Sequence, residues 1–521
     1  MSDATPKVAN PFVVSIVVSL AVFLEVLDTS VANVSLSHIA GALGASSDES
    51  TWVLTSYLVS NVIVLPLSGW LTALMGRKNF FILCIIGFTL ASFLCGMSTS
   101  MPMLIVFRLL QGLAGGGLQP SQQAIIKDSF PPEKLGMAFA ITGITTILAP
   151  ILGPMLGGYI TDNYSWRWIF LINVPVGISA AFLVNILVQD PPTAQKQKVD
   201  SVDYIGLGLI ALGLGALQIV LDKGQQEDWF DSSFIVVFAC IAAVGILLAI
   251  FWLQRQKNPV VDLKLFRIPS FTMPCVMLFF VGFALYASNI LLPMLAQENF
   301  GYDATLSGMV LSPGGVAVIC MMPVVGRLVK VVQAKYLISF GMLISAFGAW
   351  TTGFITPQID YNTFVILRIL QTIGLPFLFV PVNTLAFSKI PPESSSNASA
   401  IVSLIGNLGG SIGISLVTNK LITSQHVQQA YLVQHLTIAD SGYRSVLANY
   451  TQTIMNLGVP SAQSSSLAMG QIYQELLRQA SILAFRDTYN FVAVVLVVLG
   501  ITALFMPGNT LHKKDAAVSL H

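Results

Sequence analysis

The stretch Ala21-Val-Phe-Leu-Glu25-Val-Leu-Asp28-Thr-Ser-Val-Ala-Asn33-Val34 decides how this sequence is interpreted, because it places two carboxylates inside the first long apolar segment, residues 12–37. Glu25 and Asp28 are three residues apart, so they share one face of a helix. A charge deep in a bilayer costs about 3 kcal/mol or more, and such residues usually face a cavity and serve a function. No other acidic residue lies well inside an apolar segment. We therefore expect this pair to carry the ion chemistry of the protein.

The composition is that of a protein with many membrane spans. Of its 521 residues, 55% are hydrophobic and 9% are charged, whereas about 25% of a soluble globular chain is charged. The net charge of +1 gives no electrostatic case for nucleic-acid binding. The five cysteines lie in apolar segments without a CxxC spacing, which indicates small hydrophobic residues and neither disulfides nor metal ligands. The first apolar run is too long for a cleaved signal peptide, so we interpret it as the first span.

Fourteen apolar segments are long enough to cross a bilayer, which takes about 20 residues in a helix. This pattern predicts an all-α integral membrane protein. The predicted spans are approximately 12–37, 51–71, 79–98, 102–125, 137–160, 168–188, 204–222, 233–254, 271–293, 305–326, 336–356, 363–386, 399–418 and 488–507.

The distribution of basic residues predicts that both termini are cytoplasmic. With the N-terminus inside, 17 of the 25 Lys and Arg residues fall in cytoplasmic segments and six fall outside, while Arg108 and Arg368 lie within spans. Four of the six outside residues belong to one long loop, where charge has less influence on orientation.

An internal repeat with an offset of 260 residues divides the chain. Phe107-Arg108-Leu-Leu-Gln111 resembles Leu367-Arg368-Ile-Leu-Gln371, and each arginine is followed 23 residues later by Pro-Pro-Glu. The offset lays span 1 on span 9 and span 4 on span 12, which predicts two six-span halves with two inserted spans between them. The predicted domains are a six-helix bundle over 1–190, two inserted helices within 191–270 that polar linkers bound, and a second six-helix bundle over 271–521. Duplicated halves of this kind hold a substrate site at their interface near the membrane midplane.

The only sizeable aqueous part is the predicted outer loop 419–487, which is rich in Gln, Ser and Ala. Its leucines and isoleucine near 472–483 fall close to helical spacing, so we expect helices there. Two interpretations stay open for this loop: helices that pack on the protein itself, or a docking surface for another protein.

Several motifs resemble those of the major facilitator superfamily, in particular its fourteen-span drug:proton antiporter branch. The resemblance covers nearly the whole chain and rests on the 6 + 2 + 6 plan and on four segments taken together. These are Leu27-Asp-Thr-Ser-Val-Ala-Asn-Val34 in span 1, Gly69-Trp-Leu-Thr-Ala73-Leu-Met-Gly76-Arg77-Lys78 after span 2, Arg108-Leu-Leu-Gln111-Gly112 in span 4 and Gly153-Pro154-Met-Leu-Gly157-Gly158 in span 5. The second segment departs from the family pattern, because Ala73 stands where the family usually has an aspartate.

Two further segments, Leu221-Asp-Lys-Gly224 with Asp228-Trp-Phe230 and Asn258-Pro-Val-Val-Asp-Leu263, look like the EmrB-type pumps. This resemblance implies an antiporter of the bacterial inner membrane that exports hydrophobic or amphipathic toxic compounds in exchange for protons, by alternating access. It also implies a tripartite efflux system, in which a periplasmic adaptor protein connects the pump to an outer-membrane channel. No cofactor and no metal are expected, the proton being the coupling ion.

The charged residues of spans 1 and 4 are the predicted proton-coupling site. Burial favours the protonated form of a carboxylate and a nearby cation favours the ionised form, so a pocket that opens alternately can load and unload a proton. We expect Asp28 to bind and release the proton, with Glu25 as a second proton site or a contact for a cationic drug. Arg108 is the natural partner of these acids. The alternative is that one acid of the pair forms a purely structural ion pair with Arg108.

Other residues are candidates for substrate contact or gating. Gln111, one turn after Arg108, is expected to bind substrate or Arg108, and polar or aromatic residues elsewhere are expected to line the cavity, with interhelical hydrogen bonds as the alternative. These candidates are Asn33, Tyr286, Asn289 and Asn407. The glycines and Pro154 are expected to permit close helix contact or bending during gating, and Arg77 is either a gating contact or an ordinary positive-inside anchor. The gating set is Gly69, Gly76, Arg77, Gly153, Pro154, Gly157 and Gly158.

Three other function classes are alternatives to export. Proton-coupled uptake or exchange of a metabolite is disfavoured by the span-5 motif. An enzyme is disfavoured because the sequence has no HExxH, HxxxD or GxSxG set and none of its five histidines lies deep in a span. The lack of a P-loop points away from ATP as the energy source. A non-transporting membrane scaffold would use the loop 419–487 as its working surface.

Overall fold

The computed structural model describes residues 10–190, 203–256, 259–437 and 440–506, and these form helices with no strand among them. Thirteen helical stretches of this part are long and apolar enough to cross a membrane. They match thirteen of the fourteen predicted spans. The remaining predicted span, 336–356, is the helix α14 (Ala334–Thr352), which packs against α15, α16 and α19.

The helices of the first half begin and end where the sequence supplies caps and breakers. For example, α3 begins with a capping box between Ser46 and Glu49 and ends at Gly76, whose φ of +87° suits glycine. Span 4 is broken at Gly116–Gly117. The elements, with η denoting a 3₁₀-helix, are α1 (Pro11–Val34), α2 (Leu36–Leu43), α3 (Ser47–Met75), α4 (Arg77–Gly96), α5 (Met101–Gly115), α6 (Leu118–Ser129), η1 (Pro132–Lys134), α7 (Leu135–Asn163), α8 (Trp168–Leu171) and α9 (Asn173–Leu187).

The second half repeats this plan, including a break in span 12 at Ile373–Gly374. Its elements are α12 (Pro269–Phe300), α13 (Ala304–Leu328), α14, α15 (Tyr361–Thr372), α16 (Leu375–Phe387), η4 (Pro392–Ser394), α17 (Ser395–Val433), α18 (Ser441–Asn456) and α19 (Ser461–Ala503). The two halves meet where α7 packs along α13 and where α3 packs against α17.

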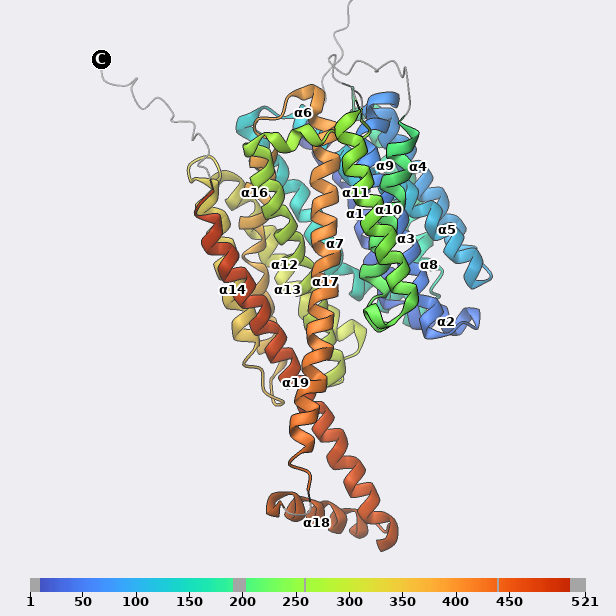
Figure 1. Ribbon diagram of the computed structural model, residues 1–521, viewed down its shortest axis with the longest axis vertical. Helices are drawn as coiled ribbons and strands as arrows, with labels where there is room; N and C mark the ends of the chain where they lie inside the picture. The colour runs from blue at the N-terminus through green and yellow to red at the C-terminus, as the bar shows by residue number, and fades with distance from the viewer. Residues whose placement is uncertain (1–9, 191–202, 257–258, 438–439, 507–521) are drawn as a thin grey trace, which may run out of the picture.

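The inserted pair is α10 (Tyr204–Lys223) and α11 (Ser233–Arg255), with η2 (Trp229–Asp231) between them and η3 (Leu263–Arg267) after them. The two helices lie side by side at the edge of the first half (Figure 1). Gly213 and Gly245 bring their backbones into contact, since a Cβ on Gly245 would lie 2.8 Å from Cα of Gly213. At the other end, Asp222 and Lys223 form hydrogen bonds with Thr55 and Thr51 on α3. The predicted linker 189–200, with the domain boundary at 190, lies largely outside the described residues, as do the terminal segments.

Two helices are far longer than a membrane span. The helix α17 has 39 residues and α19 has 43, which is about 58 Å and about 65 Å at a rise of 1.5 Å per residue. A bilayer core is only about 30 Å thick. Figure 1 shows that both helices continue beyond the bundle and that α18 lies across their far end. The helices expected in 419–487 are therefore present. They are continuous with spans 13 and 14, because α17 runs on after residue 418 and α19 begins well before residue 488.

Candidate functional site

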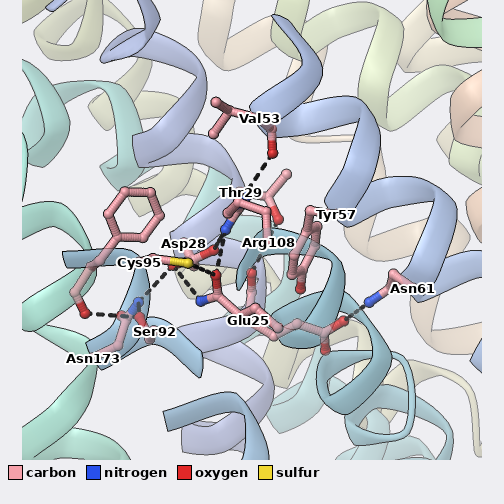
Figure 2. Close-up of polar contacts among 12 residues, drawn as sticks. Glu25, Asp28, Thr29, Val53, Tyr57, Asn61, Ser92, Cys95, Arg108 and Asn173 are labelled. Atoms are coloured by element: carbon pink, nitrogen blue, oxygen red, sulfur yellow. Dashed lines mark hydrogen bonds and ion pairs between the residues drawn. The ribbon is translucent and has the colours of Figure 1, made fainter. Parts of the chain in front are cut away.

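The predicted ion pair forms between α1 and α5. The Nη1 atom of Arg108 lies 2.5 Å from Oδ2 of Asp28. Asp28 is 2% exposed and Arg108 is 0% exposed. Figure 2 shows the two side chains facing each other, surrounded by polar groups from neighbouring helices. Separating a buried ion pair would leave an uncompensated charge in the interior. The Asp28–Arg108 pair therefore holds α1 against α5 as long as Asp28 is ionised.

The second oxygen of Asp28 is also occupied. Its Oδ1 atom accepts hydrogen bonds from Nδ2 of Asn173 at 2.7 Å and from Nε2 of Gln111 at 3.0 Å. Asn173 is the first residue of α9, and its amide also donates to Ser92 Oγ on α4. Asp28 therefore joins α1 to α5 and α9, so its ionisation state affects three helices at once.

Arg108 has a second set of neighbours on α3. Its Nε atom donates to the carbonyl oxygen of Val53 at 3.0 Å, and its guanidinium carbon lies 4.4 Å from the centre of the Tyr57 ring. A guanidinium over an aromatic face is attracted by the ring quadrupole. Arg108 therefore keeps these contacts with α3 whether or not Asp28 carries a charge.

Glu25 occupies a different environment from Asp28, although both lie on α1. Its Oε1 atom accepts a hydrogen bond from Asn61 Nδ2 on α3 at 2.9 Å, while Oε2 is buried with no hydrogen-bond partner among the described residues. Arg108 forms its only described ion pair with Asp28. Glu25 therefore keeps one buried carboxylate oxygen without a hydrogen-bond partner in the described structure, and its role as a second proton site or a drug contact stays a prediction.

The same constellation recurs in the second half without its carboxylate. The offset of 260 residues carries Asp28, Arg108 and Gln111 onto Ser288, Arg368 and Gln371. The Nη1 atom of Arg368 donates to Ser288 Oγ at 2.9 Å, and Ser288 Oγ donates to Gln371 Oε1 at 3.1 Å. The repeat thus preserves the contacts and replaces the acid with a hydroxyl, so the corresponding site of the second half cannot bind a proton in the same way.

Arg368 is fully buried, and its side-chain partners in the described part of the chain are neutral, namely Ser288 and Asn289. We expect Ser288→Asp to raise the free energy of unfolding by about 1–2 kcal/mol relative to Ser288→Asn, because a hydrogen bond between charged groups is stronger than one to a neutral group. Thermal unfolding of the two purified variants measures the difference. Equal midpoints would show that a carboxylate at this position does not pair with Arg368.

The residues predicted to bind substrate lie in different places. Gln111 is used within the Asp28–Arg108 cluster, and Asn289 accepts a hydrogen bond from Arg368. Asn33 is exposed near the end of α1. Tyr286 packs its ring against Gly410 on α17, and Asn407 on α17 donates to Gln119 Oε1 on α6 at 3.3 Å. Among these five, Asn407 makes a direct hydrogen bond between the two halves.

The span-5 motif packs against the span-1 motif. A Cβ on Gly153 would lie 2.2 Å from Ser30 Oγ, and one on Gly157 would lie 3.1 Å from the Val31 carbonyl oxygen. Pro154 has no N–H to offer the carbonyl of Pro150, and Ser30 Oγ donates to that carbonyl at 3.3 Å. Gly158 is also buried. The helix α7 is continuous through the motif despite Pro150 and Pro154. The small residues of the motif thus allow α7 to pack closely against α1, the helix that carries Glu25 and Asp28.

The loop motif after span 2 connects the halves at the predicted cytoplasmic side. Arg77 forms an ion pair with Asp128 at the end of α6, and Asp128 accepts a hydrogen bond from Ser395 at the start of α17. A Cβ on Gly69 would lie 2.5 Å from Oδ1 of Asn397, also on α17. Gly76, the remaining gating candidate, lies against Asp190. Arg77 is thereby connected to the second half through Asp128, and its gating role stays a prediction.

Sequence reasoning missed the two asparagines that complete the site. Asn61 and Asn173 lie in apolar spans, and each donates to one of the two acids. An amide inside a span needs a hydrogen-bond partner, which singles out both residues in the sequence, but spacing along the chain does not show that their partners are Glu25 and Asp28.

This arrangement agrees with the comparison to known proteins. The family model of the Major Facilitator Superfamily matches residues 18–414. The chain belongs to this superfamily. It is 34% identical over 501 residues to the multidrug export protein EmrB of Escherichia coli strain K12, with 96% of each chain covered. The probable multidrug resistance protein EmrY of the same strain is also 34% identical, with 94% of each chain covered. The EmrB-type family predicted from the motifs is thereby confirmed.

The solved structures of the superfamily confirm the fold. A double tryptophan mutant of XylE superposes with a TM-score of 0.62 at 13% sequence identity, over 96% of each chain. Family and fold are those of multi-pass membrane transporters rather than of an enzyme. Within this superfamily fold, the described residues contain no group of three or more His, Cys, Asp and Glu residues placed to hold a metal.

Proposed function

We propose that this protein is a proton-coupled antiporter that exports hydrophobic or amphipathic toxic compounds across the bacterial inner membrane. The similarity to multidrug export proteins over nearly the whole chain supports export as the activity. The buried Asp28–Arg108 pair supports proton coupling, and it is the observation on which the proposal depends. A carboxylate with an adjacent fixed cation has two stable conditions: ionised and paired, or protonated and released.

Protonation of Asp28 changes what holds α1 in place. The ionised carboxylate accepts three hydrogen bonds, from Arg108, Gln111 and Asn173. A proton on Asp28 removes the charge attraction to Arg108, while Arg108 keeps its contacts with Val53 and Tyr57 on α3. The charge attraction that holds α1 to α5 is then lost, which makes a shift of α1 relative to α5 easier.

Helix α7 transmits this shift to the other half. It packs against α1 through Gly153 and Gly157, and against α13 through Met155, which lies beside Gly308. Interfaces packed this tightly switch between discrete arrangements instead of deforming gradually. We propose that proton binding at Asp28 thereby changes which side of the interface between the halves is open to the substrate.

Drug-triggered proton release from proteoliposomes tests this function. We expect a hydrophobic substrate added to the purified protein to release protons, and a pH gradient to drive accumulation of that substrate. The direction of substrate flux relative to the proton separates export from uptake or metabolite exchange. A substrate flux that a pH gradient does not change would contradict proton coupling, and no flux at all would favour a scaffold.

The helical extension of α17, α18 and α19 supports the proposed adaptor. It carries exposed apolar side chains at the far end from the bundle, including Leu457 at 79%, Val427 at 61% and Tyr431 at 58% exposure. Exposed apolar side chains on an extension that leaves the bundle are available to contact another protein. With both termini in the cytoplasm, as the basic residues predict, the extension projects into the periplasm toward a periplasmic adaptor and, through it, an outer-membrane channel.

Replacing α18 with a short glycine–serine linker is expected to lower the amount of adaptor that co-purifies at least tenfold. A tenfold loss of affinity corresponds to about 1.4 kcal/mol, which is less than a single interface hot spot contributes. Within α18 only Ile454 is buried, so the bundle should fold without it. Proton-driven transport in proteoliposomes should persist. Full adaptor retention by this variant would place the docking surface elsewhere.

A further inference from the structure

An apolar groove of about 620 Å³ runs along the outside of the second half between α14 and α19. Its walls are aromatic and aliphatic, with Phe347 and Trp350 on α14 and Val494 and Val497 on α19. These side chains are 38–62% exposed, so the groove opens sideways to the surroundings of the bundle. The helix α19 contains a candidate membrane span and α14 corresponds to the predicted span 336–356, so we expect the groove to open to lipid.

One end of the groove is polar. Arg486 and Asn490 line it there, close to Gly353 at the end of α14. Arg486 lies just before the apolar segment 488–507, and Trp350 and Phe354 lie at the corresponding end of α14. Aromatic and basic residues in such positions mark the level of the lipid head groups.

Among the residues that the structure describes, Arg486 has no acidic partner. It forms no ion pair and no side-chain hydrogen bond in the described part of the chain, and neither does the side chain of Asn490. Its neighbour Asp487 accepts a hydrogen bond from Gln428. A cation and an amide thus remain unpaired at the head-group end of an apolar groove.

We propose that this groove is a binding site for a phospholipid with an anionic head group. An acyl chain lies along Leu343, Phe347 and Val497, and the phosphate accepts hydrogen bonds from Arg486 and Asn490. A basic residue near the membrane surface attracts an anionic lipid by about 1 kcal/mol, and the apolar wall adds burial of the chain. The bound lipid fills the seam between α14 and the long helix α19, which carries the extension beyond the membrane.

Native mass spectrometry of the full-length protein, titrated with phosphatidylglycerol or phosphatidylethanolamine, tests the proposal. We expect phosphatidylglycerol to bind more tightly, and Arg486→Ala to weaken its binding about fivefold. Arg444→Ala removes the same charge from exposed α18, away from the groove, and should leave binding unchanged. Equal binding of the two lipids, or no effect of Arg486→Ala, would overturn the proposal.

A second variant tests the apolar part of the site. Val494→Trp fills the groove from its exposed wall and should abolish the increase in melting temperature that phosphatidylglycerol gives the wild type. Val244→Trp adds the same side chain to the lipid-facing side of α11 and should keep that increase. If Val494→Trp instead abolished binding of a transported drug or separated a dimer, the groove would be a drug site or a face between two copies, and the proposal would fail.

Discussion

Asp28→Asn is expected to abolish export driven by a pH gradient. The substitution keeps the size of the side chain and removes the only carboxylate that pairs with Arg108 in the described structure. An amide cannot bind and release a proton in the physiological pH range. The site can then no longer alternate between an ionised, paired carboxylate and a protonated one. Substrate accumulation in proteoliposomes under an imposed pH gradient should fall to the level of empty liposomes. Accumulation at the wild-type rate would show that Asp28 is not the proton site.

The stability of this variant must be separated from its activity. Leaving Arg108 buried without its counter-charge is expected to destabilise the protein by up to about 3–5 kcal/mol. Adding Arg108→Met removes the unpaired charge and should recover most of the melting temperature without restoring transport. Asp162→Asn is the matched control, because Asp162 is half-exposed and its one ion pair in the described structure is with His38. Glu25→Gln should keep its hydrogen bond with Asn61 and retain the response to the pH gradient if Asp28 alone couples the proton.

Gly112→Ala is expected to lower stability by about 1–3 kcal/mol, the usual cost of forcing extra atoms into a packed interface. A Cβ at Gly112 would lie 2.1 Å from Ser60 Oγ and 2.3 Å from the Tyr57 carbonyl oxygen on α3. One of these atoms belongs to the backbone, so α5 must move away from α3. That movement also separates Arg108 from Val53 and Tyr57, and transport should therefore fall together with the melting temperature.

Gly208→Ala on α10 provides the comparison. This glycine is also inside a helix, but a Cβ there would meet nothing within 4 Å. Alanine favours a helix over glycine by about 1 kcal/mol, so this variant should be as stable as the wild type or more so. A melting temperature for Gly112→Ala equal to that of Gly208→Ala would show that the contact between α3 and α5 is loose.

Most of the fold could be predicted from the sequence, since each span is set by its own apolar length and the repeat is visible in the matching arginines. The lengths of α17 and α19 could not be predicted from apolar length, because their polar continuations carry no helix breaker at the membrane boundary. Apolar length predicts where a helix lies in lipid, whereas a helix ends where its backbone geometry changes. The helices continue into water because each packs against a partner there, α19 against both α17 and α18.

The sequence by itself determined that two acids, Glu25 and Asp28, and two arginines, Arg108 and Arg368, lie in apolar spans, because the cost of burying charge makes such residues conspicuous. Only the tertiary structure decided that Arg108 pairs with Asp28 while Glu25 turns to Asn61, although both acids share one face of α1. The physical reason is that partners come from α3, α5 and α9, whose positions depend on how all the helices pack. Spacing within one helix fixes a direction for each side chain and says nothing about what lies across the interface.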